Sequence, residues 1–221
     1  MYAAILFAHA LAGTVVLAGA AVAIATRLFG LPHRAHIWSG NAFTLGIAGI
    51  AATGLLIIVY TPSAFLVCLA VFLLYLSTMG WRHAEARGGI GGPLDTVLAL
   101  VFLSGFLFML AYGAWEAFLN GNQGGYVLLV FGTIGLLQAG ADVRYVLGAA
   151  PTGTARIAAH LTRMLGGTIG ALTAFLLIQF ETSSLWVWLG PTAVLTPLLI
   201  FWSRKVKSDW LPRRAPKPIK N

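Results

Sequence analysis

The sequence has little charge, a single cysteine and none of the common hydrolase or nucleotide-binding motifs. Charged residues make up 9% of the 221 residues and hydrophobic residues 59%, whereas an ordinary soluble domain is about a quarter charged. The lone Cys68 excludes a disulfide within the chain. No GxSxG, HExxH or P-loop sequence occurs, so the sequence contains none of these common motifs of hydrolases and nucleotide-driven enzymes. This composition indicates an integral membrane protein.

Seven apolar runs are long enough, or nearly so, to span a hydrocarbon core, which takes roughly 17–25 residues of helix. They cover residues 2–25, 37–60, 63–79, 94–118, 126–147, 158–180 and 185–202. We therefore expect an all-α, seven-helix membrane bundle over residues 1–203. The remaining residues, 204–221, are basic and contain proline, and we expect a flexible tail there.

The basic residues fall on one side of this predicted bundle. All 14 Lys and Arg residues lie in alternate connections, next to them or in the tail, while the opposite side carries only Glu116 and Glu181. The positive-inside rule then predicts that the N-terminus lies outside and the C-terminus lies in the cytoplasm. Topology also explains the net charge of +8, so we expect the tail to meet anionic lipid headgroups and no nucleic acid to bind.

The run at residues 160–174 has two different faces at helical spacing. One stripe is polar or small, and the other, which we expect to face lipid, is large and apolar. The first consists of His160, Arg163, Gly167, Gly170, Ala171 and Ala174, and the second of Leu161, Leu165, Ile169, Leu172 and Leu176. Small residues let helix backbones approach closely, so the first stripe predicts a helix crossing.

Polar residues gather near the predicted cytoplasmic face. They are His33, His36, His83, Gln138, Asp142, Arg144, Tyr145, His160 and Arg163. The candidate site consists of His36, Gln138, Asp142, Tyr145, His160 and Arg163. Gln138, Asp142 and Tyr145 share one helix face at i, i+4 and i+7. Asp142 near a membrane boundary needs a cation, and Arg163 at the start of the next helix is the candidate. The pair is interpreted first as a structural salt bridge and, alternatively, as the wall of a ligand site.

Histidine is a common ligand of haem iron and other metals, so His36 and His160 are candidate axial ligands for haem b. Two single histidines on separate helices are a weak pattern, and no CxxCH or HxxxH sequence accompanies them. Interfacial histidines bonded to backbone carbonyls are the alternative. No cofactor is the favoured expectation.

A second set of polar residues lies toward the outer face. His9 sits in the first apolar run, and Tyr112 and Glu116 lie near the end of the fourth. Ionisable residues inside a membrane often mark substrate or proton paths. These three residues are therefore candidates for an outward-facing pocket or a proton step, to which Glu181 could contribute. The alternative, which we favour, is that Glu116 extends to the lipid headgroups and His9 forms a hydrogen bond with a neighbouring helix.

Several short strings resemble, in their order, a bacterial family of predicted multi-pass membrane proteins known only as a domain of unknown function. They include the segments at residues 36–43, 80–82, 142–144, 160–164 and 196–198. The family pattern has Arg and Asn where this chain has Ile37 and Gln179. The resemblance implies a bacterial inner membrane protein with several helices and supplies no activity.

Three functions remain open at this point. The leading one is a non-enzymatic protein that binds or passes a small ligand, or serves as an accessory subunit in a membrane complex or homo-oligomer. The second is a b-type haem or quinone-linked redox protein that uses His36 and His160. The third is a proton-coupled carrier that uses His9 and Glu116.

Overall fold

The computed structural model describes residues 1–148, 150–180 and 185–208, and this part of the chain is helical with no strand. The helices are α1 (Tyr2–Leu28), α2 (His33–Ile58), α3 (Ala64–Glu85), α4 (Pro93–Ala114), the π-helical turn η1 (Trp115–Leu119), α5 (Gln123–Leu147), α6 (Gly153–Gln179) and α7 (Leu185–Ser208). Seven helices, with η1 continuing α4, are long and apolar enough to cross a membrane. The predicted all-α, seven-helix architecture is thus confirmed.

The helices extend beyond several of the predicted runs. The third was expected to end at Met79, but α3 continues to Glu85, with Arg82 and His83 in its last turn. Basic side chains near a helix C-terminus interact favourably with the exposed carbonyls and the helix dipole. α7 continues to Ser208, so the beginning of the predicted tail is helical. Glu181 and the rest of the tail, 209–221, lie outside the described residues.

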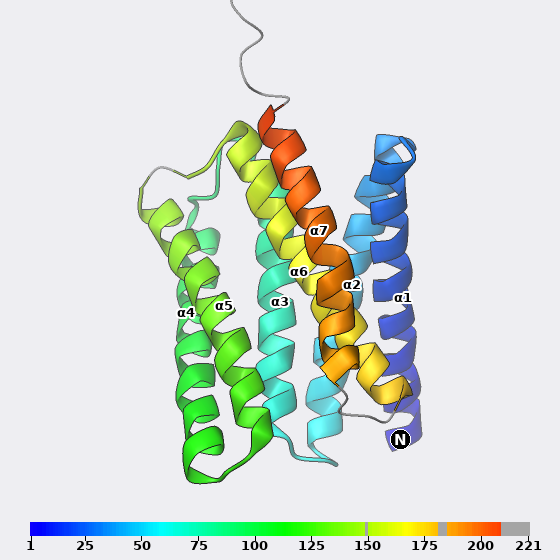
Figure 1. Ribbon diagram of the computed structural model, residues 1–221, viewed down its shortest axis with the longest axis vertical. Coiled ribbons are helices and arrows are strands. Elements are labelled where there is room, and N and C mark those ends of the chain that lie inside the picture. The colour runs from blue at the N-terminus through cyan, green and yellow to red at the C-terminus, as the bar shows by residue number, and fades with distance from the viewer. Residues whose placement is uncertain (149, 181–184, 209–221) are drawn as a thin grey trace, which may run out of the picture.

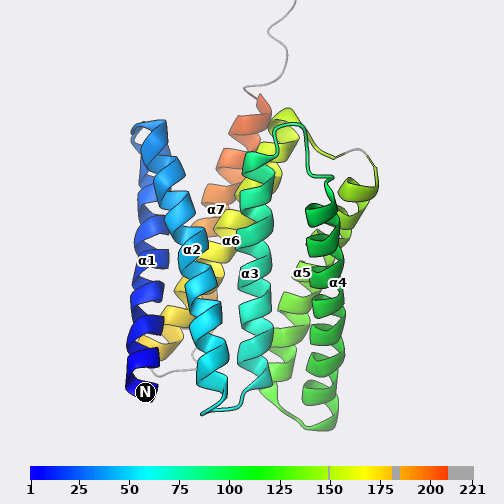
Figure 2. The ribbon, with the colours of Figure 1, turned by 180° about the vertical axis from the view of Figure 1, so that it is seen from behind.

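Two helical hairpins flank a central pair of helices. α1 packs on α2 and α4 packs on α5, while α3 packs on α6 between them (Figure 1). Seen from behind, α3 lies between α2 and the α4–α5 hairpin (Figure 2). α7 packs against α6. In the described part of the chain, α5 packs on α3, whereas the backbones of α5 and α6 do not approach each other and these two helices meet through the Arg163 side chain.

Glycines allow both hairpins to close tightly. A Cβ atom added at Gly19 of α1 would lie 2.8 Å from the carbonyl oxygen of Ser39 on α2. In the second hairpin, a Cβ at Gly125 of α5 would meet the backbone of Gly113 and Ala117. Because nothing larger than hydrogen fits at these crossings, the backbones themselves are in contact, as in other small-residue membrane interfaces.

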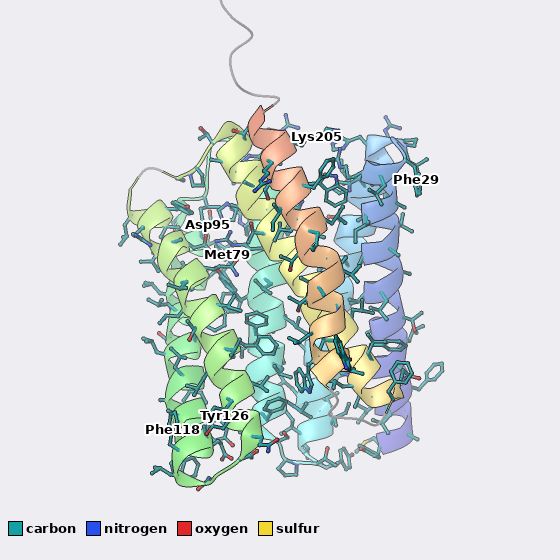
Figure 3. All side chains as sticks on the ribbon, viewed as in Figure 1. Phe29, Met79, Asp95, Phe118, Tyr126 and Lys205 are labelled. Carbon is teal, nitrogen blue, oxygen red and sulfur yellow. The ribbon has the colours of Figure 1, made fainter. Side chains whose placement is uncertain are left out.

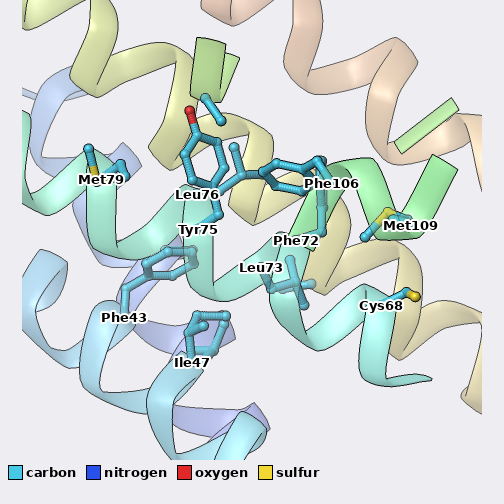
Figure 4. Close-up of a cluster of buried hydrophobic side chains, with 14 of the residues drawn as sticks. Phe43, Ile47, Cys68, Phe72, Leu73, Tyr75, Leu76, Met79, Phe106 and Met109 are labelled. Carbon is cyan, nitrogen blue, oxygen red and sulfur yellow. The ribbon is translucent and has the colours of Figure 1, made fainter. Parts of the chain in front are cut away.

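The central helix α3 contributes the most buried part of the apolar core. Its Tyr75, Leu76 and Met79 are fully buried, as are Phe106 and Met109 of α4. Figure 4 shows these side chains around α3, with the hydroxyl of Tyr75 as their polar exception. The apolar core therefore surrounds α3, and the hydroxyl of Tyr75 is the polar group at its edge.

The predicted stripe on the sixth helix does face other helices. A Cβ at Gly167 would lie 3.3 Å from the ring of Phe43 on α2, and one at Gly170 would lie 2.8 Å from Leu73 on α3. The opposite stripe is only partly as predicted. Leu165 was expected to face lipid, but it is 4% exposed, and α6 packs against both α3 and α7.

Most polar side chains of the core lie at one end of the bundle. That end holds the C-termini of α1, α3, α5 and α7 and the N-termini of α2, α4 and α6. In Figure 3, Asp95 and Lys205 lie toward this end, whereas Phe118 and Tyr126 lie at the other, where the N-terminus is found in Figure 1. We call the first end the basic end, because it carries Arg27, Arg34, Arg82, Arg144, Arg156 and Arg204.

Candidate functional site

Asp142 of α5 is the centre of a buried polar network near the basic end. The Tyr75 hydroxyl donates to its Oδ2 at 2.7 Å. Its Oδ1 accepts from His83 Nε2 at 2.9 Å and from an Arg163 guanidinium nitrogen at 2.6 Å. Asp142 and His83 are completely buried, and Arg163 is 4% exposed. One carboxylate thus joins α3, α5 and α6, the three helices that carry these side chains.

Arg163 fills several other roles in the same network. Its guanidinium also donates to the carbonyl oxygens of Ala159 and Gln138, and lies 5.9 Å from the centre of the Tyr75 ring. A charged side chain in hydrocarbon needs such partners, because an unpaired ion there costs several kcal/mol. With Asp142 ionised, the two formal charges cancel. The network is therefore a charge-balanced polar centre; we call Tyr75, His83, Gln138, Asp142 and Arg163 the Asp142 centre.

Three buried polar atoms of the Asp142 centre have no hydrogen-bond partner among the described residues. They are Nε of Arg163, Nδ1 of His83 and Oε1 of Gln138. His83 Nε2 already donates to Asp142, so Nδ1 of a neutral ring is an acceptor. Buried polar groups without partners are unfavourable, especially in a membrane. The centre thus offers one donor and two acceptors to a further polar group.

Two neighbouring contacts hold the end of α3 in place. Arg82 forms a two-pronged ion pair with Asp95 at 2.6 and 3.0 Å, and Asp95 also accepts from the backbone N–H groups of Gly91 and Gly92. Arg156 of α6 donates to the last carbonyls of α3, including that of His83. These contacts fix the position of His83. None of them involves the carboxylate of Asp142.

His36 and His160 lie side by side, with ring centres 6.4 Å apart and planes inclined by 77°. Nδ1 of His160 donates to the carbonyl of Gly80 at 2.8 Å, and Nδ1 of His36 lies 3.2 Å from the carbonyl of Ala23. Each ring therefore has Nε2 left for another partner. No group of three or more metal-binding side chains occurs in the described ranges. The expected alternative, a bond to a backbone carbonyl, is present for both.

The outer pocket predicted from His9, Tyr112 and Glu116 is not assembled in the described structure. His9 of α1 lies 2.8 Å from the Thr53 hydroxyl of α2. Glu116 of η1 accepts hydrogen bonds from Asn120 and Asn122 in the following turn. Tyr112 precedes Glu116 by one helical turn, so only these two are neighbours. The cause is the topology, because α1 and α4 belong to different hairpins that flank the central pair.

Comparison with known proteins gives no assignment: no family model, no curated protein and no solved structure matches the chain. The resemblance to a family of unknown function stays a prediction. The chemistry of the chain therefore has to be argued from its own residues.

The structure brings most of the predicted cytoplasmic residues together. Gln138, Asp142 and Arg163 belong to one network, and Tyr145 faces His83 with ring centres 6.2 Å apart. Sequence reasoning placed His83 at this face but outside the candidate site, since the third helix was expected to end before it, and it missed Tyr75. Their spacing of eight residues, close to two helical turns, would have placed both on one face had that helix been extended.

Proposed function

We propose that this chain is a bacterial inner-membrane protein, with its C-terminus in the cytoplasm, that binds or passes a small polar ligand at the Asp142 centre and is not itself an enzyme. The supporting observation is the set of unpartnered buried atoms on Arg163, His83 and Gln138 around a paired carboxylate. A purely structural ion pair would need no further donor or acceptor. A ligand with one carbonyl group and two donor hydrogens, from an amine or from two hydroxyl groups, would satisfy them.

The ionised residues serve as the rigid frame of this site. Asp142 is held by three side chains from two other helices, so its partners are fixed before a ligand arrives, which lowers the entropy lost on binding. Gln138 is the adaptable member, because its amide presents both an acceptor and a donor and is not part of the ion pair. Gln138 is therefore the residue whose replacement should affect ligand binding with the least damage to the fold.

Ligand-induced stabilisation tests this function. The thermal unfolding midpoint of the purified protein in detergent is measured against a panel of small organic acids, amines, polyols and carbonyl compounds. Binding to the folded state alone raises the midpoint. We expect at least one compound to stabilise the wild type and to have a much weaker effect on Gln138→Leu. If no compound stabilises the wild type, or if Gln138→Leu responds equally, the Asp142 centre is a structural network and the proposal fails.

A redox function is a second candidate, favoured by the two neighbouring histidines. The two rings lie with their centres 6.4 Å apart. The Nδ1 atom of each ring lies within hydrogen-bond distance of a backbone carbonyl, which is the usual way in which a metal-ligating imidazole is oriented. His36 and His160 would hold haem b, which would supply one-electron chemistry.

The absorption spectrum of the purified protein decides this second candidate. A Soret band that survives washing and disappears in both His36→Gln and His160→Gln supports haem ligation. His33→Gln is the matched control, since His33 stacks on His36 but is exposed. A protein purified from haem-supplemented cells without such a band excludes the haem proposal.

A further inference from the structure

The α4–α5 hairpin meets the rest of the bundle along a single helix. Within the described ranges, the backbones of α4 and α5 approach each other and α3, but none of the other membrane-spanning helices. Those helices form a continuous unit with α3, and we call α1, α2, α3, α6 and α7 the main body. Inside the hairpin, an added Cβ at Gly125 would meet the backbone of Gly113, so its two helices are held together as one unit. The molecule thus consists of two parts that join at α3.

The contact between the hairpin and α3 differs between the two ends of the bundle. Toward the end opposite the basic end, a Cβ at Gly124 of α5 would lie 3.5 Å from the ring of Phe65 on α3. Phe72 of α3 stacks on Phe131 of α5 with ring centres 5.0 Å apart. In both views of the ribbon, α5 leans toward α3 at this end and away from it at the basic end (Figures 1 and 2). The close, apolar contact therefore lies away from the basic end.

Charged side chains connect the two parts at the basic end. Asp95 of α4 pairs with Arg82 of α3, and Asp142 of α5 pairs with Arg163 of α6, each at 2.6 Å. Both carboxylates thus belong to the hairpin and both guanidinium groups to the main body. The side chain of Arg82 is 23% exposed and that of Arg163 is 4% exposed. Water can therefore replace the Arg82–Asp95 pair more easily than the buried pair.

The Asp142 centre is closed to solvent in this structure. Asp142 and His83 are completely buried, so the surrounding helices must separate before a ligand can contact them. The connection from α3 to α4, residues 86–92, contains four glycines. Glycine has wide conformational freedom, which allows this connection to follow a movement of α4. Separation at the basic end opens polar contacts and leaves the apolar contact at the opposite end in place.

We propose that the α4–α5 hairpin swings as one unit about its apolar contact with α3 and opens the basic end to admit a ligand to the Asp142 centre. The Arg82–Asp95 pair opens first, because water solvates both of its charges. Arg163 and Asp142 separate next, as water and the ligand enter between them. This inference rests on the proposed function and names the route of its ligand.

Distances between spin labels test the movement. The labels are attached to introduced cysteines in the purified full-length protein, in lipid nanodiscs and in a Cys68→Ala background. Phe29→Cys with Leu147→Cys joins the main body to the hairpin at the basic end, and Val59→Cys with Leu119→Cys joins them at the opposite end. All four positions are exposed. Double electron–electron resonance gives the distance distribution of each pair.

Loss of the more exposed ion pair should change only the distance at the basic end. In Arg82→Gln and in Asp95→Asn, we expect the fraction of a longer distance there to rise about threefold, as expected when a partly exposed ion pair is removed from a two-state equilibrium. The distance at the opposite end should keep its wild-type distribution. Arg27→Gln is the matched control, because Arg27 lies at the basic end and contacts His33 within the main body.

Two results would overturn the inference. One is a wild-type distribution at the basic end in both Arg82→Gln and Asp95→Asn. The other is an equal change at both ends, which would indicate general loosening of the bundle and no swing about α3.

The failure of this inference is distinguishable from that of the proposed function. If the basic end opens in these variants but no compound stabilises the wild type, the hairpin moves and the proposed function fails. If a compound stabilises the wild type in a Gln138-dependent manner but the label distances do not change, the site binds its ligand and the swinging hairpin is wrong. When both are correct, the same compound should return the basic-end distances of Arg82→Gln toward the wild-type distribution, because it binds the closed state more tightly.

Discussion

At the scale of single residues, Asp142 combines a structural and a chemical role. It is fully buried, bonded by three side chains from two other helices, and surrounded by polar atoms that lack partners. Removing one member of a buried ion pair leaves an uncompensated charge, which costs about 3–5 kcal/mol in soluble proteins. The network should therefore be the most sensitive polar feature of the molecule.

We expect Asp142→Asn to lower the free energy of unfolding by several kcal/mol, since it leaves the Arg163 cation buried without its counter-ion. The double variant Asp142→Asn/Arg163→Gln should recover part of this loss. The measurement is unfolding in mild detergent titrated with a denaturing detergent, analysed as a double-mutant cycle. Strictly additive losses would show that the two residues do not interact.

Asp95→Asn is the matched control for this cycle. Asp95 is also buried and paired, but its partner Arg82 keeps 23% of its side chain exposed. Water can therefore solvate the Arg82 guanidinium after the substitution, and the loss should be clearly smaller than that of Asp142→Asn. An equal loss at both sites would mean that burial of the cation does not set the cost.

At the scale of helices, close backbone contact explains why each hairpin holds together. Apolar side chains gain little from leaving lipid for another apolar helix, so packing and small residues decide which helices associate. The α4–α5 hairpin shows this most clearly at Gly125, where an added Cβ would reach the opposite backbone. Gly140 lies on the same helix, and an added Cβ there meets nothing within 4 Å.

These two glycines give a prediction with an internal control. Gly125→Ala should lower the thermal unfolding midpoint by several degrees, because α4 and α5 must move apart and lose contacts along their length. Gly140→Ala should be neutral or slightly stabilising, since alanine is favoured over glycine in a helix by roughly 1 kcal/mol. Thermal unfolding followed by tryptophan fluorescence measures both. Equal midpoints for the two variants would contradict backbone contact at Gly125.

At the scale of the whole molecule, charge is distributed unequally between the two ends of the bundle. The arginines of the basic end flank alternate helix connections, whereas the charged group described at the opposite end of α4 is Glu116. An asymmetry of this kind orients membrane proteins during insertion. It is the basis for placing the basic end in the cytoplasm.

Reporter fusions test this orientation. A fusion after Asn221 should be active only with a cytoplasmic reporter, and one in the turn at Gly121 only with a periplasmic reporter. If both fusions report the same side of the membrane, the chain does not cross it seven times. If each fusion reports the side opposite to the expected one, seven crossings remain, but the basic end faces outward.

Much of the candidate site could be predicted from the sequence, within limits set by helix ends. Asp142 and Arg163 were expected to pair, because a charge at membrane depth needs a counter-charge and each lies near the basic end of adjacent helices. His83 was expected at the same face but was left out of the candidate site, because no local signal separates a helix that ends at Met79 from one that continues to Glu85. The outer pocket was expected because His9 and Glu116 lie near the same predicted face, a criterion that says nothing about lateral distance.

The sequence by itself determined the features that depend on local composition, namely the number of helices and the expected orientation. Hydropathy and run length gave the seven helices, and alternating basic connections gave the expected orientation, since both effects act on each segment separately. Only the tertiary structure decided which helices are neighbours: α7 packs against α6, α3 brings Tyr75 and His83 to Asp142, and α5 and α6 meet only through the Arg163 side chain. In lipid all apolar faces are nearly equivalent. Lateral order therefore depends on close packing and pairwise polar contacts, which exist only once the helices have assembled.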